Sequence, residues 1–380
     1  MDHDSPRSAP DSTACTVELP PTTNVRLSSP GSVVASIPLM FGFHPEDSLV
    51  VLGLTSTPGG DKERVRTGVR IGLDQIRGHE REAAADLAQR LQDHGADSAL
   101  LVAFGPRGAT GVKARPDCCR KLMAAVRAQL GAGPKDERVH VVDAIYTAGG
   151  RWWSYMCRNV RCCPASGTLV PTEPPAALAS ALAYQGVAVF PSRQALDETL
   201  VPYGGPAAQA VADALAAISG VVVVAEARRL ADVLLARCAN GMPEFSNEEG
   251  ASLLAAMAEW QVRDHLASAA ADVAGAERLL SLSIELARRS SGKLDSLAPY
   301  SLTAWAAWSL GRSALAQCAV DRALAVDPDY TFAALIRAGL RHGITPESVR
   351  ASAETTRREL AAESGPPTLP TQRSSSEDGR

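Results

Sequence analysis

Short apolar runs alternate with amphipathic helical segments through the first half of the sequence. Residues 48–54 form a β-branched run, and residues 65–73 alternate apolar and polar side chains as a half-buried strand does. Because only a turn-forming stretch separates these runs, they predict a β-hairpin. The same signals predict further strands and helices, the strands at 99–104 and 139–145 and the helices at 33–40, 79–94 and 117–130. Helices between strands imply crossovers, so we expect a mostly parallel sheet with one antiparallel hairpin strand.

After Pro206 the pattern changes to a succession of helices rich in Ala and Leu. Ser246 and Glu249 have the spacing of a capping box. Small Ala316 and Ala323, followed by the helix-ending Pro328, resemble one tetratricopeptide unit, with a plain Ala-rich hairpin as the alternative. Five later helices are expected at 275–290, 299–310, 313–326, 330–342 and 345–360.

The expected organisation is therefore two domains with loose ends. We predict an α/β domain over 25–205 and an all-α domain with a tetratricopeptide-like hairpin over 206–362. The two polar ends, 1–24 and 363–380, are rich in Ser, Pro and charged residues and are expected to be disordered.

Charge and hydropathy exclude several classes of function. The chain has 38 Lys and Arg against 42 Asp and Glu, a formal charge of −4, which argues against a nucleic-acid or membrane-surface polycation. Its apolar runs are far shorter than the ~20 residues that cross a bilayer. The polar N-terminus has no signal-peptide core. We expect a soluble, cytoplasmic protein.

Common catalytic signatures are absent from the sequence. There is no Walker A loop, because the glycines of residues 105–111 have the wrong spacing and no Lys-Ser or Lys-Thr pair follows. Dinucleotide-binding, nucleophile-elbow and His-Glu-x-x-His patterns are also missing. Two unusual segments are left to carry function.

The first segment, residues 42–48, concentrates polar chemistry in a short stretch. His44, Glu46, Asp47 and Ser48 bring an imidazole, two carboxylates and a hydroxyl into five positions. The pattern is compatible with a catalytic or ligand-binding role. The alternative is a tight turn in which Pro45 fixes the backbone and Asp47 or Ser48 bonds to it.

The second segment, residues 149–164, concentrates tryptophan and cysteine. Three thiols stand at Cys157, Cys162 and Cys163. Zinc needs four ligands, so these three would require a distant fourth such as His44 or Cys118. A redox-active bridge from Cys157 to either later cysteine, and unmodified buried thiols, are the alternatives.

The expected topology brings both segments to one edge of the sheet. If the strand at 48–54 is antiparallel to the other three, its beginning lies beside their carboxyl ends, where ligands bind in open α/β sheets. The candidate site at this rim comprises His44, Glu46, Asp47, Ser48, Arg151, Trp152, Trp153, Ser154, Cys157, Cys162 and Cys163.

The same two segments carry a family resemblance. Residues 42–52 (Gly-Phe-His-Pro-Glu-Asp-Ser-Leu-Val-Val-Leu) and 151–164 (Arg-Trp-Trp-Ser-Tyr, then the three cysteines and Pro164) resemble the hallmarks of the actinobacterial domain-of-unknown-function family number 4192. The resemblance spans about residues 25–342. It implies a bacterial cytoplasmic protein and lends no activity, cofactor or catalytic residue.

Two hypotheses for function follow. The first is a binding or scaffold protein with a small ligand at the rim and a protein partner on the helical domain. The second is an enzyme in which His44 acts as general base, Asp47 orients it, and Cys157 or Cys163 is the nucleophile or a zinc ligand. Nucleic-acid binding is the weakest alternative, because acidic residues balance the scattered arginines.

Overall fold

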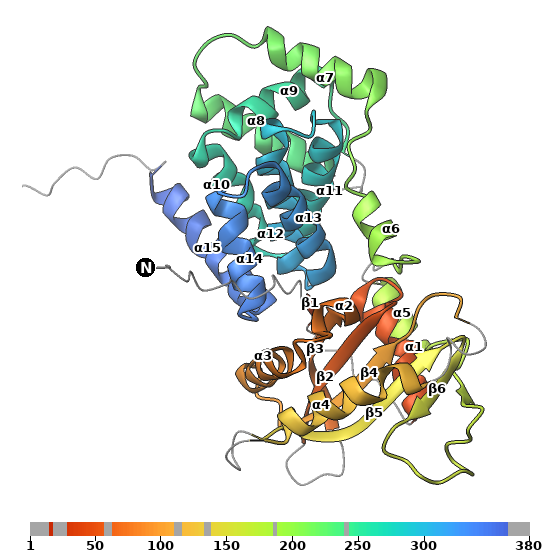
Figure 1. The fold of residues 1–380 in the computed structure, drawn as a ribbon. Coiled ribbons are helices and arrows are strands. Elements are labelled where there is room, and N and C mark those ends of the chain that lie inside the picture. Colours follow the sequence, from red (N-terminus) through yellow and green to blue (C-terminus); the bar gives the residue numbers. More distant parts are fainter. Residues whose placement is uncertain are drawn as a thin grey trace, which may run out of the picture.

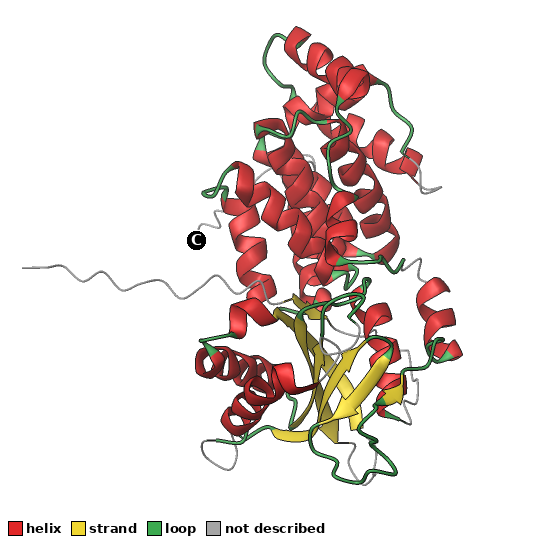
Figure 2. Cartoon of the chain, turned by 45° about the vertical axis from the view of Figure 1, so that its right-hand side comes forward, coloured by secondary structure: helices red, strands yellow, loops and turns green. Residues whose placement is uncertain are grey.

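The chain folds into a sheet with flanking helices, followed by an all-helical part. The computed structural model describes residues 15–17, 29–56, 63–109, 116–132, 138–184, 188–238 and 243–363. Figures 1 and 2 show the helical part lying against one end of the sheet. The predicted combination of an α/β part and a helical part is therefore confirmed.

The sheet has seven strands in the order β1-β3-β2-β4-β5-β6-β7. They are β1 (Cys15–Val17), β2 (Ser48–Ser56), β3 (Glu63–Gly72), β4 (Ser98–Phe104), β5 (His140–Ala148), β6 (Arg151–Ser154) and β7 (Thr168–Leu169). β2 and β3 form the predicted hairpin. Between the described strands, β4 and β5 make the one parallel pairing and the other five are antiparallel.

The prediction of a mostly parallel sheet is wrong. β3, β4 and β5 do run in one direction, but β2 lies between β3 and β4 and pairs with both. β2 suits this central place because its side chains are apolar toward both faces. At the other side, Gly149 and Gly150 have φ of 57° and 72°, and this two-residue turn folds β6 back against β5.

Helices cover both faces of the sheet. One layer consists of α2 (Leu73–Ile76), α3 (Glu80–Asp93) and α4 (Arg120–Leu130), and the other begins with α1 (Pro30–Phe41) and α5 (Ala176–Tyr184). Along β2, Leu49 and Val51 belong to the apolar cluster of α3 and α4, whereas Val50 and Leu52 belong to the α1 cluster. The α1 cluster continues into the helical part, so the two parts share one core.

The helical part confirms the sequence pattern closely. Its helices are α6 (Arg193–Glu198), α7 (Gly205–Ala217), α8 (Val224–Arg237), α9 (Asn247–Ala256), α10 (Trp260–Ser268), α11 (Val273–Arg289), α12 (Leu297–Ser309), α13 (Ser313–Val326), α14 (Thr331–Arg341) and α15 (Pro346–Glu363). The capping box is present, with the Glu249 amide donating to Ser246 Oγ over 3.2 Å. Ala316 and Ala323 are fully buried on α13. The likeness to a tetratricopeptide unit and the domain boundary at 205/206 stay predictions.

The linker into the helical part is held at both of its ends. Phe190 pairs with Phe43 in a parallel bridge beside the start of β2. On α6, Asp197 accepts two bonds from Arg322 of α13, at 2.9 and 2.6 Å. This segment therefore connects the edge of the sheet to the helices. Among the described helices, none is long and apolar enough to span a membrane.

The expected disorder at the ends is wrong for three residues. β1 lies within the 1–24 segment and pairs antiparallel with β3, because the open edge of a sheet offers unpaired backbone groups. Residues 1–14, 18–28 and 364–380 lie outside the described part of the chain.

Candidate functional site: a three-cysteine loop

The predicted rim exists at the carboxyl ends of β3, β4 and β5. Ser48, the first residue of β2, is aligned with Gly72 of β3 and Phe104 of β4. Phe104 is in turn aligned with Thr147 near the end of β5. The 42–48 segment and the start of the loop after β4 therefore lie together. Residues 110–115 of that loop lie outside the described part.

Most groups of the 42–48 segment are engaged in the turn. The buried Ser48 hydroxyl donates to the Glu46 carbonyl and accepts from Arg70 Nε at 2.8 Å. The Asp47 amide donates to the Gly105 carbonyl at 3.3 Å, and the Asp47 carbonyl accepts from the Leu73 amide at 2.8 Å. These bonds join three strand ends, which favours the turn interpretation.

Two features of the rim face solvent. The exposed Glu46 and Arg107 side chains pair at 3.1 Å. His44 is exposed beside them, and partial burial of its ring, together with the charge of Arg107, lowers its pKa. An imidazole with a lowered pKa is neutral at physiological pH and can accept a proton.

The two tryptophans of the second segment anchor a loop between β6 and β7. Trp152 is buried against α1, and Trp153 lies on the opposite face with its ring 5.8 Å from that of Tyr146. Trp153 Nε1 donates to the Ala165 carbonyl at 3.1 Å, and Arg151 Nη1 donates to the Gly167 carbonyl at 2.9 Å. Trp153 and Arg151 therefore hold the base of the loop, and Trp152 is part of the core on the α1 side.

The Ser154 hydroxyl and the Asn159 backbone shape the loop between its ends. Ser154 Oγ donates to Asp143 Oδ1 at 2.6 Å and accepts from the amides of Met156 and Cys157. The Asn159 carbonyl accepts from the amides of Cys162 and Cys163 at 3.1 and 2.7 Å. Ser154 therefore positions the first cysteine, and Asn159 the other two.

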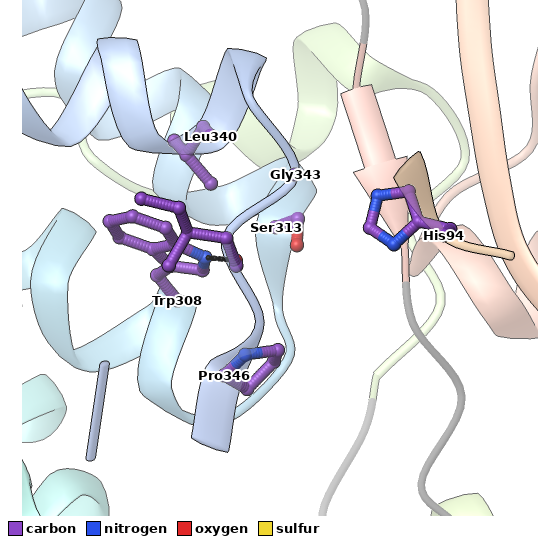
Figure 3. Close-up of a pocket in the computed structure, with 7 residues that line it drawn as sticks. His94, Trp308, Ser313, Leu340, Gly343 and Pro346 are labelled. Carbon is purple, nitrogen blue, oxygen red and sulfur yellow. Dashed lines mark hydrogen bonds between the residues drawn. The ribbon is translucent and has the colours of Figure 1, made fainter. Parts of the chain in front are cut away.

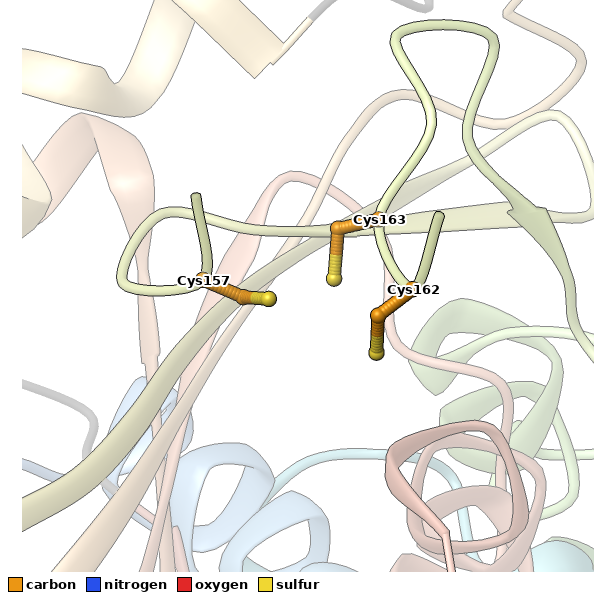
Figure 4. A group of neighbouring side chains, drawn as sticks. All are labelled: Cys157, Cys162 and Cys163. Atoms are coloured by element: carbon orange, nitrogen blue, oxygen red, sulfur yellow. The ribbon is translucent and has the colours of Figure 1, made fainter. Parts of the chain in front are cut away.

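The loop brings three thiols together. The sulfur atoms of Cys157, Cys162 and Cys163 all lie within 4.8 Å of one another (Figure 4). Cys162 is exposed and the other two are half-buried. By contrast, three further cysteines are buried in the apolar cores and serve packing: Cys119, Cys238 and Cys318.

The three thiols do not have equal acidity. A hydrogen bond from the Asn159 backbone, assisted by the neighbouring sulfurs, lowers the pKa of Cys157. Burial, with the adjacent sulfurs, raises the pKa of Cys163 to about 12. Cys157 therefore becomes a thiolate more readily than Cys163, and thiolate is the form that binds metals and attacks electrophiles.

The rim and the thiols do not converge. Arg151, the first residue of β6, is paired with Ala148 at the rim end of β5. Ser154, at the end of β6, is paired with Ile145, and the Tyr155 amide donates to the Ala144 carbonyl, so β6 runs away from the rim. The Cys157 amide bonds to Ser154 Oγ, so this cysteine lies near the level of Ile145, away from the edge where His44 lies. The fold therefore does not pair the His44 imidazole with the Cys157 thiol.

A small hollow lies elsewhere, where the helical part meets α3. It is lined by His94, Trp308, Ser313, Leu340, Gly343, Ile344 and Pro346 (Figure 3). Its volume of about 10 Å³ holds one water molecule at most. A β-carbon at Gly343 would fall 2.2 Å from His94 Nε2, so this is a packing contact between the two parts.

Comparison with known proteins identifies the family. The model of a domain of unknown function, DUF4192, matches residues 30–347. The chain belongs to the DUF4192 family. The matched range of this DUF4192 chain contains the rim segment, the three-cysteine loop and most of the helices. No curated protein and no solved structure matches the chain.

The structural roles of three residues that shape the loop of this DUF4192 chain were not predicted from the sequence. In the sequence, Asp143 is a single polar residue within a predicted strand, and Asn159 is one polar residue of a predicted loop. Gly167 has φ of 77°, and a β-carbon there would fall 2.5 Å from Trp153 Cε2. The available signal was local: Asn and Gly are the residues that most often allow such turns.

Proposed function

We propose that this protein binds a thiophilic metal ion, Zn²⁺ in the first instance, at the three-cysteine loop. The observation that carries the proposal is the convergence of three sulfur atoms within 4.8 Å. In tetrahedral zinc the Zn–S bond of about 2.3 Å places sulfurs roughly 3.8 Å apart. Movements of about 1 Å in a solvent-exposed loop therefore suffice to close the site.

The surroundings of the sulfurs support a metal more than simple packing. Cysteines that serve packing are usually buried, as Cys119, Cys238 and Cys318 are. Here one sulfur is exposed and two are half-buried, and Ser154 and Asn159 fix the backbone that presents them. Such outer hydrogen bonds are the usual support of a metal site. Thiolate ligands select zinc over harder ions such as magnesium.

The fourth coordination position distinguishes two kinds of site. Among the described His, Cys, Asp and Glu side chains, the group that converges here consists of the three cysteines. His44 belongs to the rim, whereas Ser154, which bonds to Cys157, is aligned with Ile145 inside β5, and the side chain of Cys118 is outside the described part. A water molecule in that position would leave zinc open to a further ligand, whereas Cys118 would close it.

Elemental analysis and metal titration of the full chain test the proposal. We expect about one zinc per chain, at least tenfold weaker binding in each single variant Cys157→Ser, Cys162→Ser and Cys163→Ser, and no binding in the triple variant. Cys238→Ala, a buried thiol elsewhere, is the matched control and keeps the wild-type affinity. Cobalt substitution reports the number of thiolates through charge-transfer bands, and Cys118→Ser shows whether that thiol is a ligand. Zinc retained by the triple variant, or none bound by the wild type, refutes the proposal.

Ligand binding at the rim is a second candidate. It is supported by the exposed His44 beside the Arg107–Glu46 pair. We expect a small anion that binds at the rim to contact Arg107. Arg107→Ala then lowers the affinity for the anion, whereas the cysteine-to-serine variants of the loop leave it unchanged. If every ligand tried raises the melting temperature of wild type and Arg107→Ala equally, the proposal of a ligand site at the rim is wrong. A protein partner for the helical part remains a prediction.

A further inference from the structure

The chain geometry limits which thiols of the loop can form a disulfide. Cys162 and Cys163 are neighbours, so their Cα atoms are about 3.8 Å apart across a trans peptide. The usual separation in a disulfide is about 4.4–6.8 Å. A bridge between the neighbours is therefore strained, and Cys157 must be one partner in any relaxed bridge.

The loop also has the freedom to make such a bridge. Residues 158–162 are all exposed, and Val160 is 75% exposed although it is apolar. No core packing of these side chains opposes a shift of the backbone between the cysteines. From a separation within 4.8 Å, two sulfurs must approach to about 2.05 Å, a movement that side-chain rotation and a small loop adjustment supply.

The loop is open to solvent between the cysteines. Arg158 and Arg161, which lie between Cys157 and Cys162 in the chain, are both exposed. Cys162 is the most exposed of the three sulfurs and therefore open to a dissolved oxidant.

We propose that peroxide converts the three-cysteine loop into a disulfide between Cys157 and either Cys162 or Cys163, and thereby releases the bound metal ion. One thiolate attacks the O–O bond, becomes a sulfenic acid, and the leaving oxygen is protonated to water. The second thiolate attacks the sulfenic sulfur, the S–S bond forms, and the hydroxyl departs as a second water. Two sulfurs have each lost one electron and the peroxide has gained two.

The ion leaves because the bridge consumes two of its three ligands. Release of the ion rests on the proposed function, whereas formation of the bridge depends on the thiols alone. Reduction by a dithiol restores both thiolates, so binding returns. The loop is then a reversible switch between a metal-bound and an oxidised state.

The test uses the full-length chain loaded with zinc and treated with a small excess of hydrogen peroxide. Free thiols are counted after denaturation, released zinc is read with a colorimetric chelator, and bridged peptides are mapped by mass spectrometry. We expect the wild type to lose two thiols and its zinc together, and to regain both with dithiothreitol. Cys238→Ala behaves in the same way, with one thiol fewer from the start.

Single variants separate the pairing from other oxidation. Cys157→Ser forms no bridge within the loop, whereas Cys162→Ser and Cys163→Ser each keep one partner for Cys157 and form it. A bridge between Cys162 and Cys163, or conversion to sulfinic acid without a bridge, overturns the inference. If zinc binds but stays bound while the bridge forms, the switch fails and the metal site stands. If no zinc binds but Cys157 still bridges, the proposed function fails and the pairing alone stands.

Discussion

Ser154 and Asp143 form a 2.6 Å hydrogen bond between β6 and β5, and the same Ser154 oxygen accepts the amide of Cys157 at 2.9 Å. The hydroxyl can accept two amides because its own proton is committed to the carboxylate. The position of the first cysteine is thus set by a rigid strand and not by the loop alone. A site held in this way loses little entropy when an ion binds.

Replacing this serine is expected to weaken metal binding without removing a ligand. Ser154→Ala leaves the Met156 and Cys157 amides without their acceptor, so we expect the zinc dissociation constant to rise about 10- to 100-fold. Competition with a chromophoric chelator measures it. Ser166→Ala, in an exposed position of the same loop, is the matched control and leaves the constant unchanged. Equal affinity in both variants would show that the loop positions Cys157 unaided.

Metal binding is expected to release protons and to tighten as pH rises. The pKa of Cys163 is raised to about 12, so its thiol is protonated in the free protein at neutral pH. Zinc takes the thiolate, and at least one proton per ion must leave. Each released proton makes the apparent affinity rise about tenfold per pH unit.

Calorimetry in two buffers of different ionisation enthalpy counts those protons. Cys163→Ser is expected to release at least one fewer than the wild type. An affinity that is the same at about pH 6 and about pH 8 contradicts the assignment of Cys163 as a thiolate ligand.

Replacing the glycine near the end of the loop is expected to lower the stability of the protein. Gly167 has φ of 77°, and a β-carbon there would lie 2.5 Å from Trp153 Cε2. Gly167→Ala is expected to lower the free energy of unfolding by about 3 kcal/mol, from the left-handed backbone and the displaced indole together. Gly150 has φ of 72°, but no atom lies within 4 Å of the added β-carbon. Gly150→Ala is therefore expected to lower the free energy of unfolding by about 1 kcal/mol, from the left-handed backbone alone. Urea denaturation compares the two, and equal losses would mean that the ring moves freely.

The sequence predicted helices and strands well in segments where a single hydrophobic periodicity dominates. The runs at 48–54 and 99–104 became β2 and β4, and residues 313–326 became α13 with the same bounds. Apolar periodicity decides these segments because burial of their side chains is the largest favourable term. It does not decide strand order. β2 takes its place between β3 and β4 because its own two faces are apolar, a choice made by tertiary packing.

The candidate site was predicted in composition but not in location. The cysteines stood out in the sequence, and their mutual approach depends on Ser154 and Asn159, whose role is visible only once the backbone is placed. The expectation that they meet His44 assumed that the loop stays at the rim. The Gly149–Gly150 turn instead sends the chain back along β5, and the cysteines move away from that edge.

Asp47 allows a test of the turn interpretation at the rim. Its φ of 41° is the one positive value among the described residues other than glycine, and such a backbone costs about 1–3 kcal/mol. If the segment serves only as a turn, Asp47→Gly relieves this cost, and after the added entropy of glycine the free energy of unfolding is expected to rise by about 1 kcal/mol. Asp47→Ala, which keeps the strain and removes the carboxylate, is the control. A gain in stability for glycine without one for alanine, measured by urea denaturation, supports the turn. A loss in both variants instead means that the carboxylate holds the rim together, and that the strain is maintained for the sake of that side chain.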